Sequence, residues 1–376
     1  MPPKGHAILS ASSSRRWLNC PPSARLCEKY ADVVTDYTTE GTDAHTLCEY
    51  KLRKALGMKT SDPTENLTWY NEEMEDCATA YATYVLEFLE DAKQNCTDPV
   101  VMVEQRVDFS RWVQNGFGTA DCIIIADGTM GIIDYKHGKG VEVSAVDNEQ
   151  MKLYALGALE IFDGIYDIDR VRMTIFQPRL ANVSAFEITK EDLLKWADEI
   201  LIPTAKLAYE GRGKFHSGDW CRFCKAKAEC RERAEVNLAL AKYEFTEPPL
   251  LADEEIADIL GKVDALTAWA ADVKEYALQQ AISGKEWSGW KLVEGRCNRK
   301  YTNESTAASA VEQAGFDPYE HKVLGITAMQ KLLGKSRFEE LLAGYIEKPA
   351  GKPTLVLESD KRPAINTAEN DFKGEN

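Results

Sequence analysis

The stretch GTADCIIIADGTMGIIDYKHGKG, residues 118–140, decides the fold because it contains two β-rich runs around a tight turn. Residues 119–126 and 130–136 are short apolar segments rich in isoleucine. The Asp127-Gly128 pair between them is a strong sequence signal for a hairpin. The stretch therefore predicts two adjacent strands joined by this turn.

Helical patterns lie on both sides of this hairpin. Apolar residues recur at intervals of three and four in residues 42–56 and 71–93, a spacing typical of amphipathic helices. The other predicted elements are a strand at 100–109, a helix at 149–162, a strand at 171–178 and a helix at 190–209. The resulting order, helix, three strands, helix and strand, predicts a mixed α/β fold.

Two aspartates and a lysine lie on the predicted hairpin. Side chains alternate along a strand, so Asp134 and Lys136 point to the same face. Asp121 precedes an apolar run, where a buried carboxylate is costly without a partner. Hard divalent cations bind through one or two carboxylates plus substrate phosphate, which suits Asp121 and Asp134. The alternative is a strand-end aspartate and a surface ion pair between Asp134 and Lys136.

Four segments resemble, in their order and spacing, the PD-(D/E)XK nucleases, and within them the RecB-like and Cas4-like branch. The matching segments are EGTDAH (40–45), GTAD (118–121), IIDYKHGKG (132–140) and the pair Gln150 and Tyr154. The resemblance covers roughly residues 8–235. It implies an α-β-β-β-α-β nuclease core with helical additions and a smaller, mainly helical C-terminal region.

The resemblance also assigns a role to each matching residue. It implies that His45, Asp121 and Asp134 bind Mg²⁺ or Mn²⁺, and that Lys136 completes a catalytic group with the two aspartates. Position 134 holds Asp where the family more often has Glu, and Glu104 is a weak candidate for an additional acidic ligand. Residues expected at the DNA are Gln150, Tyr154, Arg15, Arg16 and Lys139. Taken singly, His45, Gln150 and Tyr154 are ordinary helix residues.

A second constellation is the cysteine pattern Cys221-x2-Cys224-x5-Cys230, with Cys20 far upstream. Three cysteines at this spacing leave one position of a tetrahedral metal site open, and Cys20 is the natural fourth ligand. Thiolate ligation suits both Zn²⁺ and an iron–sulfur cluster, and unligated cysteines are the remaining alternative. The arrangement resembles the [4Fe–4S] site of Cas4-like and AddB-like nucleases, which favours iron. The cysteines without ligand spacing are Cys27, Cys48, Cys77, Cys96, Cys122 and Cys297.

The overall charge excludes a global attraction to nucleic acid. Lys and Arg number 45 against 61 Asp and Glu, a net charge of −16. Two cysteine-bearing stretches, 1–30 and 211–233, are basic. If they meet at one metal site, they form a local positive patch with Trp17, Trp220 and Phe223 that suits single-stranded DNA. The alternative is a solvated basic face.

The rest of the sequence supports expectations about the domain organisation and the cellular location of the protein. We expect a nuclease domain at 1–240, a mainly helical accessory domain at 241–345 and a flexible tail at 346–376. The C-terminal part, including 351–365, resembles phage proteins of the DUF2800 group. No window reaches the ~18 apolar residues of a membrane span, so a cytoplasmic location is expected, in the host cell if the protein is encoded by a phage. No P-loop is present.

Together these features predict a metal-dependent DNA nuclease, more specifically an exonuclease acting in phage recombination or replication. Its partners would be single-stranded DNA or duplex ends, together with phage single-stranded DNA-binding or replication proteins. The alternative is a non-catalytic DNA-end binder or replication scaffold that keeps the nuclease fold as a platform.

Overall fold

The computed structural model describes residues 7–32, 34–94, 96–240, 250–295, 301–319, 322–347, 354, 356 and 360. The chain divides into two units, Met1–Gln280 and Ala281–Asn376. The predicted boundary at residue 240 stays a prediction, and the residues that follow it directly, 241–249, lie outside the described ranges. Most of the predicted tail at 346–376 also lies outside them.

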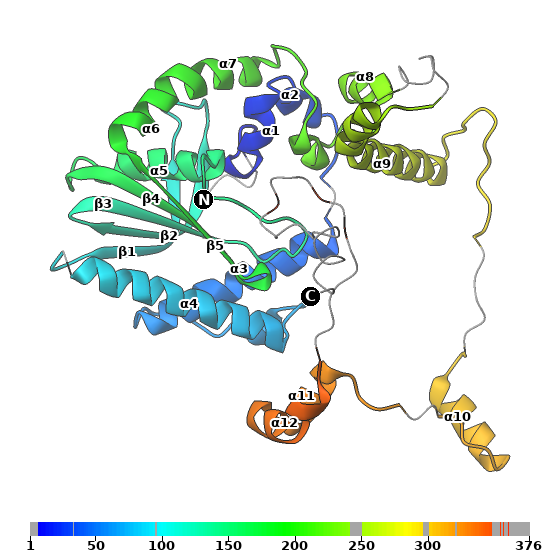
Figure 1. Cartoon of the computed structure of the whole chain (residues 1–376). Helices are drawn as coiled ribbons and strands as arrows, with labels where there is room; N and C mark the ends of the chain where they lie inside the picture. The colour runs from blue at the N-terminus through cyan, green and yellow to red at the C-terminus, as the bar shows by residue number, and fades with distance from the viewer. Residues whose placement is uncertain are drawn as a thin grey trace, which may run out of the picture. The chain divides into compact units, whose positions relative to one another are not determined.

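The first unit is built on a five-stranded mixed sheet (Figure 1). Its strands are β1 (Val100–Asp108), β2 (Phe117–Ala126), β3 (Gly128–Tyr135), β4 (Ile168–Gln177) and β5 (Asn182–Thr189). They lie in the sheet in sequence order. Only β3 and β4 pair in parallel, and the other neighbours pair antiparallel. The mixed α/β prediction is therefore confirmed at the level of fold class.

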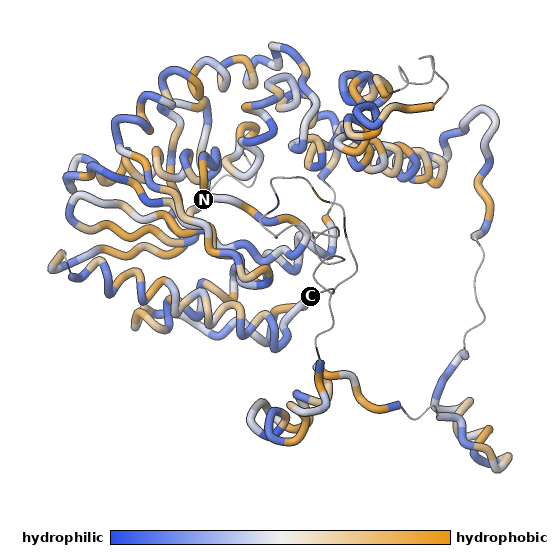
Figure 2. The backbone as a smooth tube through the Cα atoms, in the orientation of Figure 1, coloured by the Kyte–Doolittle hydropathy of each residue, from blue (hydrophilic) through white to orange (hydrophobic). Residues whose placement is uncertain are grey.

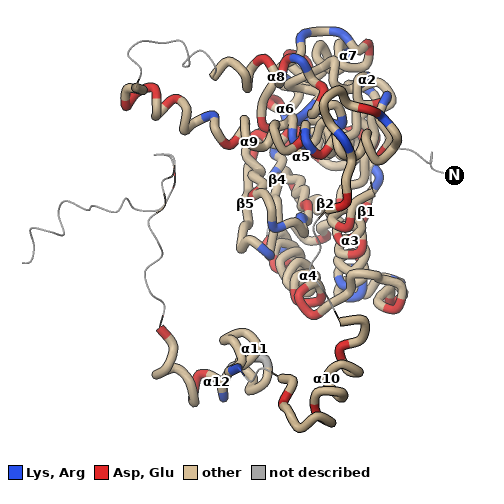
Figure 3. Tube along the Cα trace, turned by 90° about the vertical axis from the view of Figure 1, so that its right-hand side faces the viewer, with Lys and Arg blue, Asp and Glu red and all other residues tan. Residues whose placement is uncertain are grey.

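Helices cover both faces of this sheet. One face packs against α3 (Asp36–Ala55) and α4 (Glu72–Lys93) in one buried cluster. The other face packs against α5 (Glu149–Phe162) in a second cluster, which also includes Trp17, Leu193 and Ala205. Figure 2 shows the apolar colouring concentrated in the central strands, and Figure 3 shows acidic and basic residues interspersed along the helices. The result is a three-layer arrangement.

Side-chain caps fix where the principal helices begin. Asn71 accepts a hydrogen bond from the Met74 amide at the start of α4, and Asn148 does the same for Met151 in α5. Such caps satisfy amides that have no partner within the helix. Because residues 151–159 of α5 are all buried, this cap also fixes the position of the first turn of α5, where Gln150 lies.

Five shorter helices belong to the first unit. They are α1 (Ser14–Asn19), α2 (Ser23–Cys27), α6 (Lys190–Trp196), α7 (Ile202–Glu210) and α8 (Arg231–Leu238). The long helix α9 (Asp253–Ile282) follows, and the first unit ends within it at Gln280. One π-helical turn, Ala197–Leu201, joins α6 to α7, and a 3₁₀ turn, Asp219–Phe223, carries Cys221. Further 3₁₀ turns are Ala11–Ser13, Thr64–Asn66 and Pro178–Leu180.

The predicted order of elements is confirmed, with two differences. Helix α3 begins at Asp36, six residues before the predicted start, because Thr35 and Thr38 form a reciprocal cap there. Strand β5 was not predicted from the sequence. Its side chains alternate between half-buried and exposed positions, as expected for an edge strand that packs on only one face.

The second unit contains α10 (Glu304–Gln313), α11 (Ile326–Leu333), α12 (Lys335–Leu342) and the 3₁₀ turn Ala343–Tyr345. The tryptophan-rich stretch 287–295 forms neither helix nor strand. Among the helices in the described ranges, none has the length and apolar character that crossing a bilayer requires.

Candidate functional site

The candidate site begins where β2 and β3 separate. Their backbone pairing runs from Ala126 to Cys122 on β2. At the next residue, Asp121, a side chain replaces the backbone partner, because its Oδ2 atom accepts the Tyr135 amide at 2.7 Å. Strand β3 continues to pair with β4, so that Asp134 lies opposite Ile175. The separation places Asp121 and Asp134 on neighbouring strands at the point where the two strands diverge.

An irregularity in β1 faces the same point. Glu104 has a φ angle of 53°, a left-handed conformation that is uncommon for a non-glycine residue and often marks functional positions. Val103 packs with α3 and α4, whereas Val107, four residues later, packs with α5. Regular alternation would place both on one face, so β1 changes faces at Glu104.

These strand features and α3 bring three ligand-bearing side chains together. One ligand atom each from His45, Glu104 and Asp121 lies within 4.8 Å of the other two. The His45 Nδ1 atom is 3.3 Å from Asp121 Oδ1. The Tyr135 ring meets the His45 ring edge-on at a centroid distance of 5.5 Å, which helps to orient the imidazole. An imidazole and two carboxylates form a donor set suited to a divalent cation.

The pKa shifts of His45, Glu104 and Asp121 show how the charges of these three side chains affect one another. Burial and the Asp121 carboxylate raise the pKa of Glu104 to about 7. Burial opposes the charged form of His45, but Asp121 outweighs it and raises the pKa of His45 to about 9. Burial likewise opposes ionised Asp121, yet His45 and Lys136 hold its pKa below the usual value. His45 thus supplies the positive charge that Asp121 needs.

Four of the predicted residues form a hydrogen-bonded network beside this triad. Asp134 is only 2% exposed, and its Oδ2 atom lies 2.7 Å from Lys136 Nζ. Gln150 donates to Asp134 Oδ1 at 3.2 Å and accepts from Lys136 Nζ at 3.2 Å. Its amide also lies 3.0 Å from the Tyr154 hydroxyl. Burial raises the pKa of Asp134 against the opposing effect of Lys136. Asp134 and Gln150 therefore hold the Lys136 ammonium in place.

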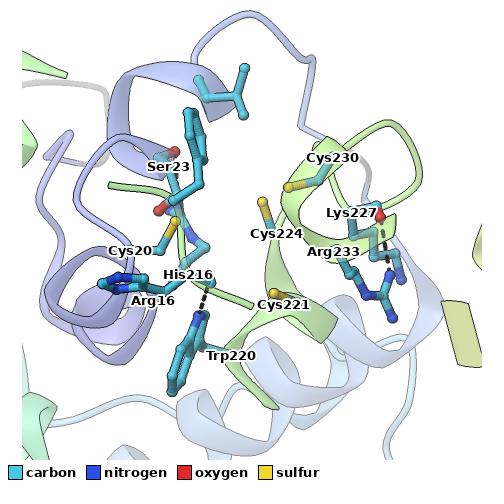
Figure 4. Close-up of a pocket in the computed structure, with 12 residues that line it drawn as sticks. Arg16, Cys20, Ser23, His216, Trp220, Cys221, Cys224, Lys227, Cys230 and Arg233 are labelled. Atoms are coloured by element: carbon cyan, nitrogen blue, oxygen red, sulfur yellow. Dashed lines mark hydrogen bonds between the residues drawn. The ribbon is translucent and has the colours of Figure 1, made fainter. Parts of the chain in front are cut away.

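The four predicted cysteine ligands line one pocket, far from the carboxylates in sequence (Figure 4). Cys20 follows α1, Cys221 and Cys224 belong to the segment around the 3₁₀ turn, and Cys230 precedes α8. Among the contacts that join these distant segments, Arg15 pairs with Asp219 at 2.6 Å, and a ring nitrogen of His216 lies 3.1 Å from the Asn19 carbonyl oxygen.

A fifth cysteine lies beside this pocket. The Cys27 sulfur is 3.7 Å from the Cys224 sulfur, and both residues are buried. Arg16 donates to the Cys27 sulfur at 3.1 Å. The hydrogen bond from Cys224 and the nearby Arg16 charge outweigh burial and lower the pKa of Cys27 to about 6. Cys27 was not predicted as a ligand because it lacks the spacing that identifies the other four.

The family comparison covers almost the whole chain. A family model described as "Protein of unknown function (DUF2800)" matches residues 6–363. The chain belongs to the DUF2800 family. The resemblance to DUF2800 proteins expected from the C-terminal sequence is therefore confirmed, and the match extends over the sheet, the triad and the cysteine pocket as well.

One solved structure is described as "Crystal structure of SSO0001". It is 14% identical to this DUF2800 chain, and the aligned region covers 51% of this chain and 98% of the other. The TM-score is 0.23, which is too low to infer a shared fold.

The structure of the DUF2800 chain groups the predicted ligands differently from the sequence. His45 and Asp121 meet as expected, but the third member of the triad is Glu104. Asp134 instead bonds Lys136 and Gln150, so its role as a metal ligand stays a prediction. The positive φ of Glu104 leaves no trace in the sequence, so the residue pattern alone makes Glu104 only a weak candidate ligand.

The predicted DNA-binding residues are mostly engaged with other side chains in the DUF2800 chain. Gln150 and Tyr154 bond inward to the network, and Tyr154 is only 7% exposed. Arg15 pairs with Asp219, and Lys139 pairs with Glu73 at 2.8 Å. Their contacts with DNA stay predictions.

The predicted stacking patch beside the cysteines is only partly exposed. Trp17 is fully buried and donates to the Ser10 carbonyl at 3.1 Å, so the expectation that it would join a surface patch is wrong. Phe223 is 72% exposed. Several basic residues of 211–233 pair with acids, as Lys227 and Arg233 do with Asp272. The positive field at this surface is therefore weaker than the sequence predicts.

Proposed function

We propose that this DUF2800 protein is a metal-dependent DNA nuclease, more specifically an exonuclease acting in phage DNA recombination or replication. The observation that carries the proposal is the convergence of His45, Glu104 and Asp121 within 4.8 Å. It is supported by a buried Asp134–Lys136 pair held by Gln150. Two independent backbone features, the separation of β2 from β3 and the left-handed Glu104, create this convergence.

The donor set fits one or two Mg²⁺ or Mn²⁺ ions. His45, Glu104 and Asp121 would hold the cation, and Asp134, which pairs with Lys136 and Gln150 in the structure, would be a further ligand. A divalent cation in such a site polarises a phosphoryl oxygen and lowers the pKa of a bound water. In the structure His45 and Lys136 lower the pKa of Asp121; a bound cation would take over this compensation, and His45 would ligate it as the neutral imidazole.

The protein's own residues supply orientation and positive charge. Lys136 is held by Asp134 and Gln150, so its ammonium is fixed before substrate arrives. A preorganised cation of this kind stabilises negative charge that develops on phosphate oxygens. Gln150 orients Lys136 and Asp134 at once, and Tyr154 in turn supports Gln150. We assign Lys136 to charge stabilisation, and Gln150 and Tyr154 to positioning.

The cysteines fit a structural [4Fe–4S] cluster in this proposal, held by Cys20, Cys221, Cys224 and Cys230. Four thiolates around one Zn²⁺ at about 2.3 Å lie roughly 3.8 Å apart. Among the described residues, no three cysteine sulfurs lie within 4.8 Å of one another, although four cysteines line one pocket. A cluster with one thiolate on each of four irons accommodates this wider spacing. Zinc is the alternative that metal analysis distinguishes.

The test is digestion of end-labelled DNA in the presence of Mn²⁺ or Mg²⁺. Single-stranded and duplex substrates are compared for the wild type, His45→Gln and Asp134→Asn. A matched control is Asp76→Asn, an exposed aspartate on α4. We expect cation-dependent cleavage by the wild type and the control, and loss of cleavage in both site variants with unchanged circular dichroism.

The same assay decides against the alternative of a non-catalytic DNA-end binder. A gel-shift measurement on the same labelled substrates accompanies each digestion. Retained DNA binding without cation-dependent cleavage in the wild type would favour the scaffold. Cleavage at the wild-type rate by Asp134→Asn would remove the catalytic assignment.

A further inference from the structure

One cysteine pair at the pocket includes a thiol that the proposed ligand set does not use. Cys27 lies at the end of α2, and its sulfur is 3.7 Å from that of Cys224. A disulfide needs the two sulfurs at about 2.0 Å, so a shift of less than about 2 Å would close the bond. Both side chains are buried, at 4% and 9% exposure.

The surroundings hold this pair in place. Cys27, Cys224 and Ala226 form a small buried cluster, against which Leu26 and Tyr30 pack. Arg16 donates to the Cys27 sulfur and also to the Ser23 carbonyl and hydroxyl. The guanidinium thus lies against the sulfur that would carry negative charge during oxidation. Cys224 lines the pocket and is 9% exposed, so a small oxidant would reach the pair through this side chain.

We propose that Cys27 and Cys224 form a thiol–disulfide redox pair that withdraws Cys224 from the metal site. The oxidant is a peroxide. One sulfur attacks the O–O bond of hydrogen peroxide and becomes a sulfenic acid, with release of one water. The second sulfur then displaces the hydroxyl group as a second water and forms the S–S bond. Two thiols lose two protons and two electrons in total, and the peroxide accepts both.

Oxidation and metal binding compete for the same sulfur in this mechanism. A Cys224 thiolate bound to a metal or cluster is not free to pair, and a Cys224 in a disulfide cannot ligate. The pair therefore makes occupancy of the cysteine site depend on the oxidant concentration. This inference does not require that the protein cleaves DNA.

A direct test is possible because tryptic cleavage places Cys27 and each of the four proposed cysteine ligands in a separate peptide. Cleavage after Lys and Arg places Cys27 in LCEK (26–29) and Cys224 in FCK (223–225). The other three fall in WLNCPPSAR (17–25), FHSGDWCR (215–222) and AECR (228–231). Full-length metal-free protein is treated with hydrogen peroxide, alkylated with iodoacetamide and digested without reductant. Mass spectrometry then identifies each linked pair.

We expect LCEK linked to FCK as the main disulfide, and its loss after dithiothreitol. Protein loaded with iron and sulfide, or with zinc, should give less of this pair at the same peroxide dose. Linkage of FCK to one of the other three peptides, or alkylated Cys27 and Cys224 after oxidation, would overturn the proposal. Because these outcomes use the wild-type chain, they do not depend on a variant that folds.

Two cysteine variants test whether Cys27 is responsible for the loss of metal under oxidation. Cys27→Ser removes the proposed disulfide partner of Cys224. This variant should therefore keep its bound metal at peroxide doses at which the wild type loses it. Cys96→Ser removes a buried cysteine elsewhere and should behave as the wild type does. Equal metal loss in Cys27→Ser and the wild type would contradict the inference.

Discussion

Glu104 is the residue whose backbone indicates function most directly. A non-glycine residue held in the left-handed region costs about 1–3 kcal/mol, which the surrounding structure must offset. Removing its charge in Glu104→Gln should weaken Mn²⁺ binding by at least about tenfold, because one of three ligands is lost. Isothermal titration of Mn²⁺ into the purified chain measures this change.

A control and a companion variant separate ligand loss from strain. Glu87→Gln, at an exposed position of α4, should bind Mn²⁺ with wild-type affinity. Glu104→Gly should also lose affinity, yet raise the free energy of unfolding by about 1 kcal/mol because glycine adopts the left-handed region without strain. A destabilised Glu104→Gly variant would show that the conformation carries no strain.

Lys136 provides a second test at the scale of single residues. A substitution there should lower the cleavage rate while the affinity for the cation changes little. Replacing it with Met removes the charge but keeps the length of the side chain. We expect cleavage to fall by about 10²- to 10³-fold, while Mn²⁺ affinity changes little. Single-turnover digestion of labelled DNA measures the rate, and Lys93→Met at the end of α4 is the control. A parallel loss of Mn²⁺ affinity would instead make Lys136 a support for the ligands.

The sequence identifies some of these residues and misses others for physical reasons. His45 and Asp121 lie in segments whose order and spacing could be recognised, and the structure brings them together. Glu104 owes its position to a backbone angle, which no local residue pattern encodes. Cys27 meets Cys224 through the packing of α2, a tertiary contact across 197 residues.

At the scale of elements, the contact between β2 and α5 depends on the absence of a side chain at Gly118. A Cβ atom there would lie 2.7 Å from the Tyr154 ring, and Tyr154 supports Gln150. Gly118→Ala should therefore lower the free energy of unfolding by about 1–3 kcal/mol, as overpacked cores do, and should also slow cleavage. Urea unfolding measures the first effect.

The matched control is Gly164→Ala, where a Cβ atom would meet nothing within 4 Å. Its free energy of unfolding should stay within about 0.5 kcal/mol of the wild type. Wild-type stability in Gly118→Ala would mean that α5 moves away from β2 without cost.

Helix α5 could be predicted at both of its ends, whereas the edge strand β5 was missed. The amphipathic helix at 149–162 matches α5 at both ends, because an asparagine cap and a continuous apolar run define it. Strand β5 was missed although Ser184, Phe186 and Ile188 alternate with exposed residues. Its period of two was the available signal, but the polar composition of an edge strand resembles that of a loop.

At the scale of the whole chain, the cysteine pocket should act as a clamp between the N-terminal segment and residues 221–230. Cys20→Ser and Cys221→Ser should each lose most of the bound metal and lower Tm by at least about 5 °C, given that structural metal sites contribute directly to folding. Metal analysis, visible absorption and calorimetry measure these effects. A brown protein with iron indicates the cluster, and a colourless one with zinc indicates a single ion.

The control is Cys96→Ser, which lies outside the pocket and should retain the full metal content. Full metal content in Cys20→Ser would show that the N-terminal cysteine is not a ligand. The domain boundary was less accessible to sequence reasoning than this clamp. Composition changes near residue 240, whereas the two units divide within the continuous helix α9.

The pairing of Asn19 and Arg15 with residues 216–219 has a consequence for biosynthesis. At about 5–20 residues per second, a ribosome needs roughly 10–40 s to travel from Cys20 to Cys230. The five strands lie side by side in the order in which they emerge, so the sheet can assemble during that interval. Until the last thiol leaves the exit tunnel, Arg15, Asn19 and Cys20 therefore lack the partners that residues 216–230 supply.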